Sequence, residues 1–282
     1  MIALALAEDL QQRGDLTSEA LIATDAEAEI RVVARQAGML AGTPAAELLF
    51  QTLDPSVDWR TVVDDGQPLQ PGTDVAVVRG PVRSLLGGER TALNFLTHLS
   101  GIATLTRRFV DAAAGTAAKI LDTRKTLPGY RVLQKYAVRA GGGTNHRMGL
   151  FDGILIKDNH LAAWREAGDS HSIAEAVSGA RQSAPAGTPI EVEVDTLEQL
   201  EDALAASPEL VLLDNMDCDQ TREAIALRDS HSAGTKLEAS GGITLDNVAE
   251  IAHTGVDRIS IGALTHSAPA LDLAFDWKSA VR

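Results

Sequence analysis

Residues 190–215, IEVEVDTLEQLEDALAASPELVLLDN, place two short β-rich runs on either side of an amphipathic stretch. The runs are Ile190–Val194 and Leu210–Leu213. The same alternation fills the second half of the chain, with β-rich runs at 119–121, 153–156, 190–194, 210–213, 236–239 and 258–261. Six such runs separated by helices imply a parallel sheet. Because the runs are nearly all apolar, we expect strands that are buried on both faces, as in a barrel or barrel-like closed sheet.

The first part of the chain mixes element types instead. It combines a helical start, a β-like run at 29–34, a helix near 44–53 and strands around 57–63 and 75–78. This order is typical of an α+β layer. From Ser84 to Ala114 the apolar residues recur at three and four positions, which predicts a helical region that Gly101 allows to break.

Composition and charge exclude several classes of protein. The chain has 282 residues, 45% hydrophobic and 23% charged, which is enough for a sizeable core. Its net charge of −14 at pH 7 would repel a phosphate backbone, so we expect no nucleic-acid partner. No apolar run approaches the roughly 20 residues that span a bilayer, and Met1–Ala7 is typical of a helix start rather than a signal peptide.

The one cysteine, Cys218, bears on the compartment. A single cysteine cannot form an intramolecular disulfide, and a chain of this size without cross-links is typical of the cytoplasm. We therefore expect a cytoplasmic protein without membrane contact, in which Cys218 is a small buried thiol rather than a nucleophile.

Polar and charged residues follow each of the six runs. In parallel α/β barrels the loops at the carboxyl ends of the strands converge on one cavity, so we expect a single pocket to collect these residues. Capping of the next helix explains any one of them but explains the whole set poorly. The residues are Asp122, Thr123, Arg124 and Lys125; Lys157, Asp158, Asn159 and His160; Glu193 and Asp195; Asp214 and Asn215; Ser240, Gly241 and Gly242; and Gly262.

A basic segment between Asp122 and Lys157 stands out in this acidic chain. It contains seven Lys or Arg residues and two acidic ones. A solvated helix face is one interpretation of three of them, at 131, 135 and 139, which lie four residues apart. The other four, at strand tips or in glycine-rich loops, indicate a small, multiply charged anion as ligand. These four are Arg124, Lys125, Arg147 and Lys157.

Two glycine-rich loops complete the candidate site. In Gly141–Arg147, three glycines let the backbone approach a ligand before His146 and Arg147 are presented side by side. A structural, hydrogen-bonded role for His146 remains an alternative, and a metal role is not favoured without a spaced second His or Cys. The loops at 240–242 and 262–263 indicate a phosphate bound by backbone N–H groups, unless their glycines serve only as tight turns.

Two acidic residues, Glu193 and Asp214, are expected in the same cavity. They could hold sugar hydroxyls or a Mg²⁺ ion that accompanies phosphates. The alternative is that they are buried acids that neutralise Lys157.

Several motifs resemble the quinolinate phosphoribosyltransferase family, over nearly the whole chain. The family implies a two-domain protomer, an α/β sandwich with an open α/β barrel of the type II phosphoribosyltransferase kind. We expect the sandwich over 1–115, joined by 266–282, and the barrel over 116–265. The motifs are DTRKTLPG at 122–129, GGGTNHR at 141–147, IKDNH at 156–160, ERTALN at 89–94, LSGIAT at 99–104, EVEVD at 191–195, LDN at 213–215 and EASGGI at 238–243.

The resemblance also implies an activity and its partners. The reaction converts quinolinate and phosphoribosyl pyrophosphate into nicotinate mononucleotide, pyrophosphate and CO₂, with Mg²⁺, as part of NAD biosynthesis. The expected assembly is a homodimer with shared active sites, alone or within a larger assembly. Carried over by position, the quinolinate site consists of Thr123, Arg124, Lys125, His146, Arg147 and Lys157, with Arg90 from the other subunit. Glu193 and Asp214 take the ribose hydroxyls and the metal, and the phosphate site consists of Ser240, Gly241, Gly242, Gly262 and Ala263.

Two other functions remain open at this point. In a barrel aldolase, Lys157 would form a Schiff base with a carbonyl substrate, although the surrounding cations exceed what that chemistry needs. A non-catalytic anion-binding relative would keep the fold without turnover, because a fold alone does not fix a function.

Overall fold

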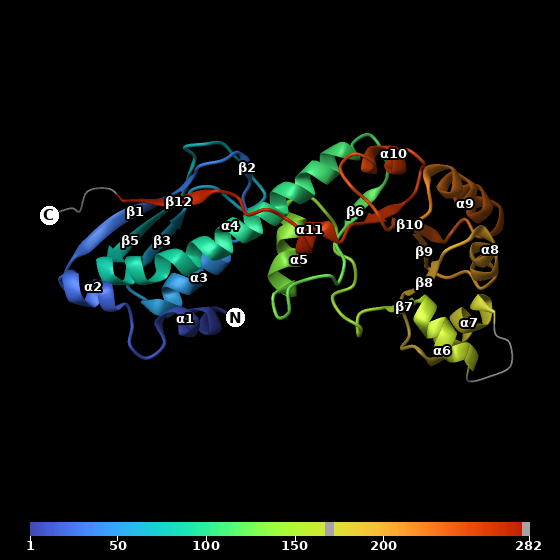
Figure 1. Ribbon diagram of the computed structural model, residues 1–282, viewed down its shortest axis with the longest axis horizontal. Coiled ribbons are helices and arrows are strands. Elements are labelled where there is room, and N and C mark those ends of the chain that lie inside the picture. The colour runs from blue at the N-terminus through green and yellow to red at the C-terminus, as the bar shows by residue number, and fades with distance from the viewer. Residues whose placement is uncertain (167–171, 278–282) are drawn as a thin grey trace. The chain divides into compact units, whose positions relative to one another are not determined.

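The computed structural model describes residues 1–166 and 172–277, and the chain divides into two compact units (Figure 1). Unit 1 comprises Met1–Arg107, Thr126–Gly142 and the segment that starts at Leu264. Unit 2 comprises Arg108–Lys125 and Gly143–Ala263. These units differ from the expected division at 115/116 and 265/266, chiefly because residues 126–142 return to unit 1.

Unit 1 is built on a four-stranded antiparallel sheet in the order β12-β1-β5-β3. The C-terminal strand β12 pairs with β1, so the two ends of the chain share this unit. The sheet strands are β1 Glu27–Ala34, β3 Asp58–Thr61, β5 Asp74–Pro81 and β12 Leu273–Trp277, and a separate pair consists of β2 Gly38–Met39 and β4 Pro68–Leu69. The helices are α1 Ile2–Leu10, α2 Leu16–Leu21, α3 Thr43–Leu53, α4 Val82–Ala112, α5 Arg131–Ala140 and α11 Ala263–His266.

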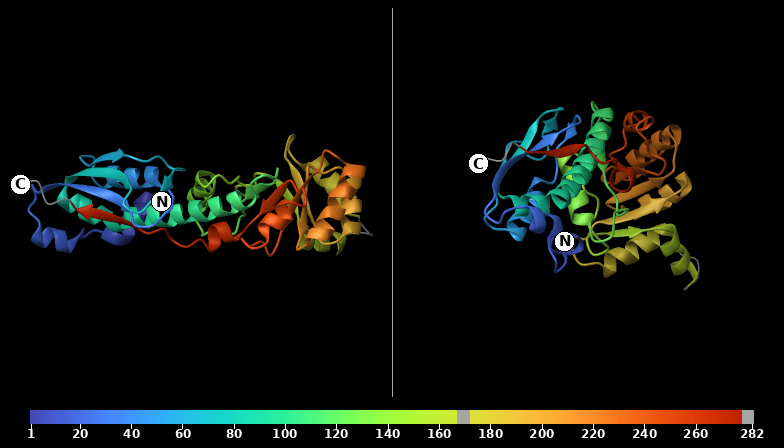
Figure 2. Two further views of the ribbon diagram at one scale, coloured as in Figure 1. Left: turned by 90° about the horizontal axis from the view of Figure 1, so that it is seen from above. Right: turned by 60° about the vertical axis from the view of Figure 1, so that its left-hand side comes forward.

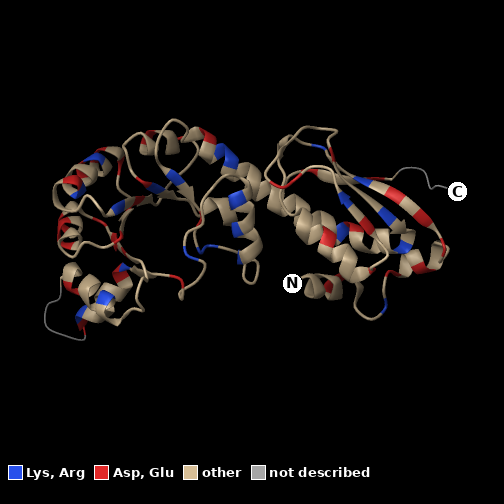
Figure 3. Cartoon of the chain, turned by 180° about the vertical axis from the view of Figure 1, so that it is seen from behind, with Lys and Arg blue, Asp and Glu red and all other residues tan. Residues whose placement is uncertain are grey.

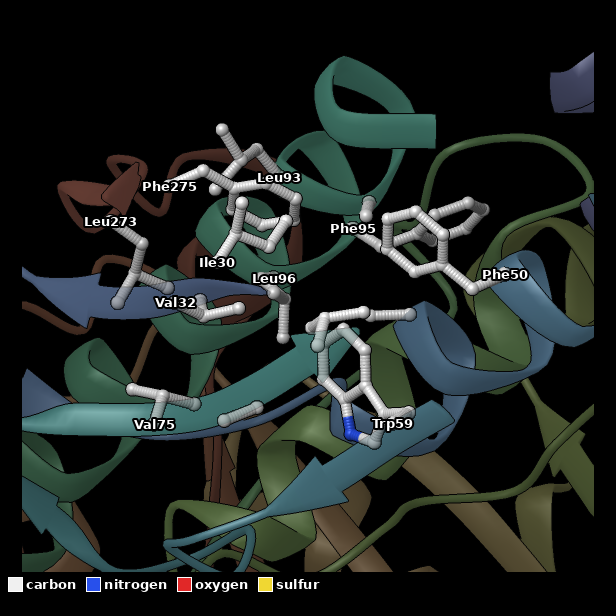
Figure 4. Close-up of a cluster of buried hydrophobic side chains, with 14 of the residues drawn as sticks. Ile30, Val32, Phe50, Trp59, Val75, Leu93, Phe95, Leu96, Leu273 and Phe275 are labelled. Carbon is white, nitrogen blue, oxygen red and sulfur yellow. The ribbon is translucent and has the colours of Figure 1, made fainter. Parts of the chain in front are cut away.

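The core of unit 1 lies between this sheet and helices α3 and α4 (Figure 4). Strand residues alternate between two faces, so Ile30 and Val32 of β1 point to the same side and are both fully buried. Phe50 of α3 stacks against Trp59 of β3, with ring centroids 5.9 Å apart. Unit 1 is thus a sheet with helices packed on it.

Helix α4 runs unbroken through Gly101, so the predicted break at this glycine is wrong. Glycine is needed at this position because another segment of the chain passes close to it. A Cβ atom at Gly101 would lie 2.1 Å from the carbonyl oxygen of Pro269, in the segment that leads to β12. The lack of a side chain therefore serves packing rather than flexibility.

We expect Gly101→Ala to destabilise the protein by about 1–3 kcal/mol, because the backbone of residue 269 must move to admit the methyl group. Gly179→Ala in α7 (Ile173–Ser183) is the matched control, since a Cβ there meets no atom within 4 Å. Alanine favours the helix by about 0.5–1 kcal/mol over glycine, so this variant should be more stable. Equal midpoints of thermal unfolding for the two variants would contradict this role of Gly101.

Unit 2 contains a six-stranded parallel sheet in the order β6-β11-β10-β9-β8-β7. Each predicted run forms one of its strands, so the α/β fold with a parallel sheet is confirmed. The sheet has two edge strands, β6 and β7, and is therefore open, as the family resemblance implies, and not closed as expected from the apolar runs. The strands are β6 Lys119–Leu121, β7 Ile154–Ile156, β8 Ile190–Val194, β9 Leu210–Asp214, β10 Lys236–Ser240 and β11 Arg258–Ser260. The helices are α6 Asp158–Glu166, α7 Ile173–Ser183, α8 Leu197–Ala205, α9 Cys218–His231 and α10 Val248–Ala252.

Helices such as α8 and α9 flank the sheet of unit 2 (Figure 2) and start soon after the strands end. Thr196 caps α8 by accepting a hydrogen bond from the Gln199 N–H, and Asp217 forms a capping box with Gln220 at α9. Cys218 follows this cap and is half-buried rather than fully buried. Burial and nearby acidic residues raise the pKa of its thiol, which disfavours a nucleophilic role.

In the part of the chain that the structure describes, no helix combines the length and the apolar character that crossing a bilayer demands.

Candidate active site

A cavity of about 470 Å³ lies at the carboxyl ends of the unit 2 strands. All of its lining residues belong to unit 2. Seven of the sixteen strand-end residues expected in one pocket line this cavity, whereas the other nine do not, and His160 lines a separate cavity of about 340 Å³. Four lining residues, Leu155, Leu212, Glu238 and Ser260, were not predicted. The cavity is lined by Thr123, Arg124, Lys125, His146, Arg147, Leu155, Lys157, Glu193, Leu212, Asp214, Glu238, Ser240 and Ser260.

The strand register explains which residues reach the cavity. Glu193 of β8 stands opposite Leu212 of β9, and Asp214 of β9 stands opposite Ser240 of β10. Since side chains alternate between the two faces of a strand, Leu212 and Asp214 share the inner face. Glu238 and Ser240 do the same on β10. The outer helices carry many acidic residues (Figure 3), whereas the cavity collects cations among its lining residues.

The cationic side of the cavity consists of Arg124, Lys125, Arg147 and Lys157. The Arg147 Nη1 donates to the Gly153 carbonyl oxygen at 2.8 Å, which fixes the guanidinium. Burial lowers the pKa of Arg147, and the positive charge of Arg124 lowers it further. Two positive charges close together repel each other, so an anionic ligand that contacts both is favoured.

The acidic side consists of Glu193 and Asp214. Glu193 accepts a hydrogen bond from the Lys157 Nζ, so the interpretation that it neutralises this lysine has structural support. Asp214 instead accepts from the Asn215 Nδ2 at 2.8 Å. The two carboxylates lie on adjacent strands and line the same cavity.

His146 occupies the floor of the cavity, between two buried glutamates. Its Nε2 lies 3.1 Å from Glu191 Oε2 and 3.3 Å from Glu238 Oε1. Its backbone N–H donates to the buried Asp122 carboxylate at 2.9 Å. Arg258 completes the cluster by donating from Nε to Glu238 Oε2 at 2.7 Å. These contacts support the structural, hydrogen-bonded role of His146 that the sequence left open as an alternative.

The charges in this cluster perturb one another. Burial opposes the charged form of His146, but hydrogen bonds to Glu191 and Glu238 outweigh it and raise the pKa of the ring to about 9. Burial raises the pKa of Glu191, and the nearby Glu238 carboxylate adds to this. For Glu238, burial again acts upward, yet His146 and Arg258 prevail and lower the pKa. We therefore treat His146 as an imidazolium and Glu238 as a carboxylate at neutral pH.

The ligand atoms of His146, Glu191 and Glu238 all lie within 4.8 Å of one another, as in a metal site. The charge state argues against a metal there. A metal binds the neutral imidazole, whereas these two glutamates favour the protonated ring. Glu238 is moreover paired with Arg258. The cluster is an ionic network rather than a metal centre.

The glutamates of this network were missed as site residues. In the sequence they stand within the motifs at 191–195 and 238–243. The signal that could have found them is the period of two in a strand: Glu191 shares a face with Glu193, and Glu238 shares one with Ser240.

The glycines predicted to hold phosphate shape the backbone beside the cavity. Gly241 has φ +90°, and a Cβ atom there would lie 2.1 Å from the Asn215 Oδ1. Gly242 has φ +62°. Both positions therefore require glycine for a tight turn, while Gly262 and Ala263 precede and begin the short helix α11. These four residues are not among the cavity's lining residues, and only Ser240 of the predicted phosphate group is.

Arg90 lies in α4 of unit 1 and is exposed. It lines a separate cavity of about 210 Å³ in that unit, together with Asp9 and Tyr130. The structure therefore does not bring Arg90 together with the other predicted residues inside unit 2.

The solvated helix face expected at residues 131, 135 and 139 is wrong for its central member. Lys135 is fully buried in α5, whereas Arg139 is exposed. The reason is that α5 packs within unit 1, where Gln134 donates to the carbonyl oxygen of Thr265. Only Lys135 of the three is therefore inside the fold, and Arg131 is half-buried.

The fold and the site together define an α/β protein with a strand-end cavity for a small, multiply charged anion. The sequence matches the family profile "Quinolinate phosphoribosyl transferase, N-terminal domain" over residues 15–100 and the corresponding C-terminal domain over residues 102–276. The chain belongs to the quinolinate phosphoribosyl transferase family, which confirms the resemblance.

Individual relatives agree with this assignment. The chain is 47% identical to the nicotinate-nucleotide pyrophosphorylase [carboxylating] of Mycobacterium leprae, over 96% of this chain and 94% of that protein. It is 46% identical to a probable enzyme of the same name from Bacillus subtilis, over 93% and 88%. The crystal structure of NadC from Streptococcus pyogenes superposes with a TM-score of 0.91 at 38% identity, covering 99% of this chain and 96% of that one.

Proposed function

We propose that the unit 2 cavity binds quinolinate and phosphoribosyl pyrophosphate and converts them into nicotinate mononucleotide, pyrophosphate and CO₂, a step of NAD biosynthesis. The observation that carries this proposal is a single cavity that is lined both by four Lys or Arg residues and by the carboxylates of Glu193 and Asp214. A pyridine dicarboxylate suits the first, and a ribose with its pyrophosphate leaving group suits the second. Membership of the family supports the same reaction.

On the cationic side, the four Lys and Arg residues take the two carboxylates of quinolinate. Guanidinium groups bind carboxylates in bidentate fashion, and lysines add compact positive charges. Thr123 and His146 line the same side. Because a pyridine with a single carboxylate makes fewer of these charge-assisted hydrogen bonds, the site should favour quinolinate over such a ring.

On the acidic side, Glu193 and Asp214 bind the ribose hydroxyls and a Mg²⁺ ion. Carboxylate oxygens are the ligands that Mg²⁺ prefers, and these two line the same cavity on adjacent strands, so the donor set fits the ion. When bound, Mg²⁺ supplies positive charge for the departing pyrophosphate. The Ser240 hydroxyl and the turn at Gly241, Gly242, Gly262 and Ala263 are proposed to hold the ribose phosphate.

The chemistry then follows from the charges of the chain. The pyridine nitrogen attacks C1 of the ribose while the C1–O bond to pyrophosphate breaks, and the positive charge that develops on the ribose is stabilised by Glu193 or Asp214. In the resulting pyridinium, the carboxylate next to the ring nitrogen leaves as CO₂, and the electron pair of the broken C–C bond stays on the ring carbon. The adjacent positive nitrogen stabilises this pair until a proton takes the place of the carboxylate. The residues of the cationic side orient the ring for both steps.

The proposed assembly is a homodimer with shared active sites, alone or within a larger assembly, in which Arg90 reaches the partner's cavity. Its exposure, and its position outside the lining of the unit 2 cavity, support a role in another subunit. With Cys218 as its one cysteine, the chain forms no internal disulfide, which supports a cytoplasmic location.

The aldolase alternative is less consistent with the geometry. Lys157 is ion-paired with Glu193, whereas a Schiff-base lysine needs a neutral amine in an apolar pocket or beside another cation.

The purified protein should form nicotinate mononucleotide from quinolinate and phosphoribosyl pyrophosphate in an end-point assay. We expect Lys157→Ala to lower kcat/KM by about 100-fold, the equivalent of about 3 kcal/mol, with little change in thermal unfolding. Lys236→Ala, at the exposed amino end of β10, is the matched control and should retain activity. Quinolinate binding without pyrophosphate release would favour the non-catalytic alternative, and borohydride trapping of a substrate on Lys157 would favour the aldolase.

Coexpression of Arg90→Ala with Lys157→Ala tests the shared site. In a mixed dimer, one cavity contains both defects and the other contains neither. Random pairing makes about half of the dimers mixed, so about a quarter of all sites should be intact although each variant alone is nearly inactive. Activity no higher than the average of the two single variants would show that Arg90 does not complete a partner's site.

A further inference from the structure

The His146 network connects strands that are not neighbours in the sheet. Glu191 lies on β8 and Glu238 on β10, and β9 separates these strands. Asp122 directly follows the edge strand β6 and accepts the backbone N–H of His146. The ring of His146 therefore sits where three separate parts of the sheet interior meet, and its position depends on all of them.

The glutamates hold the ring of His146 from one side. The Nε2 faces both of them. The backbone N–H of Arg147 points at Nδ1 from 2.8 Å, and Nδ1 accepts this hydrogen bond only while the ring is neutral. The two glutamates therefore set the position and the charge of the ring and, through the chain, the position of the residue that follows it.

Arg147 is the residue that benefits from this arrangement. It belongs to the cationic side of the cavity, and its guanidinium is anchored to the Gly153 carbonyl oxygen. The loop that carries it is anchored at its other end by a hydrogen bond from the Thr144 N–H to the Ile120 carbonyl oxygen of β6. Between these anchors, His146 is the buried attachment of the loop to the sheet.

The charges of the network are balanced without a substrate. Glu191 and Glu238 face His146 and Arg258, and Asp122 and Arg147 lie beside the same ring. Both glutamates are almost completely buried, and Glu191 Oε1 has no hydrogen-bond partner. An arrangement that leaves a buried carboxylate oxygen unpaired is costly, so a functional reason for keeping it is expected.

We propose that Glu191 and Glu238 are positioning residues for the dicarboxylate side of the cavity. They clamp the Nε2 of His146 at the cavity floor, and His146 in turn fixes the backbone from which Arg147 reaches quinolinate. The proposal rests on the proposed function, because it assigns the clamp to the binding of that substrate. In this proposal His146 contributes a fixed positive charge to the cavity and is not itself a ligand of a substrate carboxylate.

The kinetic test is a double-mutant cycle between Glu191→Gln and His146→Asn. Glu191→Gln should raise the KM for quinolinate about tenfold, with changes of at most about twofold in kcat and in the KM for phosphoribosyl pyrophosphate. In the His146→Asn background the same substitution should change the KM for quinolinate by less than about twofold. Glu198→Gln, on the exposed surface of α8, is the matched control and should leave all three constants unchanged.

The second readout needs no substrate. The ring nitrogens of His146 are followed by NMR over pH, and the resonance is assigned by its absence in His146→Asn. The wild-type ring should stay charged to a pH of about 9, consistent with its raised pKa. In Glu191→Gln it should lose its proton at least about one pH unit lower, because one carboxylate partner is gone.

The outcomes separate this proposal from the proposed function. A wild-type protein that makes no nicotinate mononucleotide contradicts the proposed function. A His146 ring that titrates alike in wild type and Glu191→Gln overturns the clamp whatever the activity, and so do additive KM effects in the cycle. If Glu191→Gln does not fold, Glu238→Gln is expected to show the same selective rise in the KM for quinolinate, and an unchanged KM there contradicts the proposal.

Discussion

Charged side chains inside a parallel sheet must be paired or must meet a ligand, and the organisation of unit 2 follows from this constraint. In its deeper part, Glu191 and Glu238 are paired with His146 and Arg258, so no substrate is needed to balance them. The same cavity is lined by Arg124, Lys125, Arg147 and Lys157, and quinolinate is the dianion that the family's reaction requires. The interior thus combines a permanent ionic network with a site whose charges are completed by substrate.

The strand order distributes the charged residues of the cavity. The cations stand at or after β6 and β7, the two edge strands, and in the loop that returns to β6. The acids stand at β8 and β9, between those edges. One cavity can therefore hold a dicarboxylate through its cations and a phosphorylated sugar through its hydrogen-bonding residues. The reacting nitrogen and C1 then lie between the two substrates.

The sequence predicted the six parallel strands well, because each is a short apolar run followed by chemistry-bearing residues such as Asp214. It predicted less where tertiary packing decides. The spacing of Lys135 predicts a solvated side chain, but this residue is buried. Gly101 is predicted to allow a break in its helix, but its lack of a side chain instead makes room for the backbone of Pro269. Glu191 escaped notice as a site residue because nothing in a single sequence distinguishes a buried strand glutamate from an exposed one until the register is known.

A crystal structure of the protein with bound quinolinate tests the central claim most directly. We expect both carboxylates to contact the cationic side, through Arg124, Lys125, Arg147 and Lys157, while His146 remains between Glu191 and Glu238. Quinolinate bound against Glu193 and Asp214, or outside the unit 2 cavity, would contradict this division of the site.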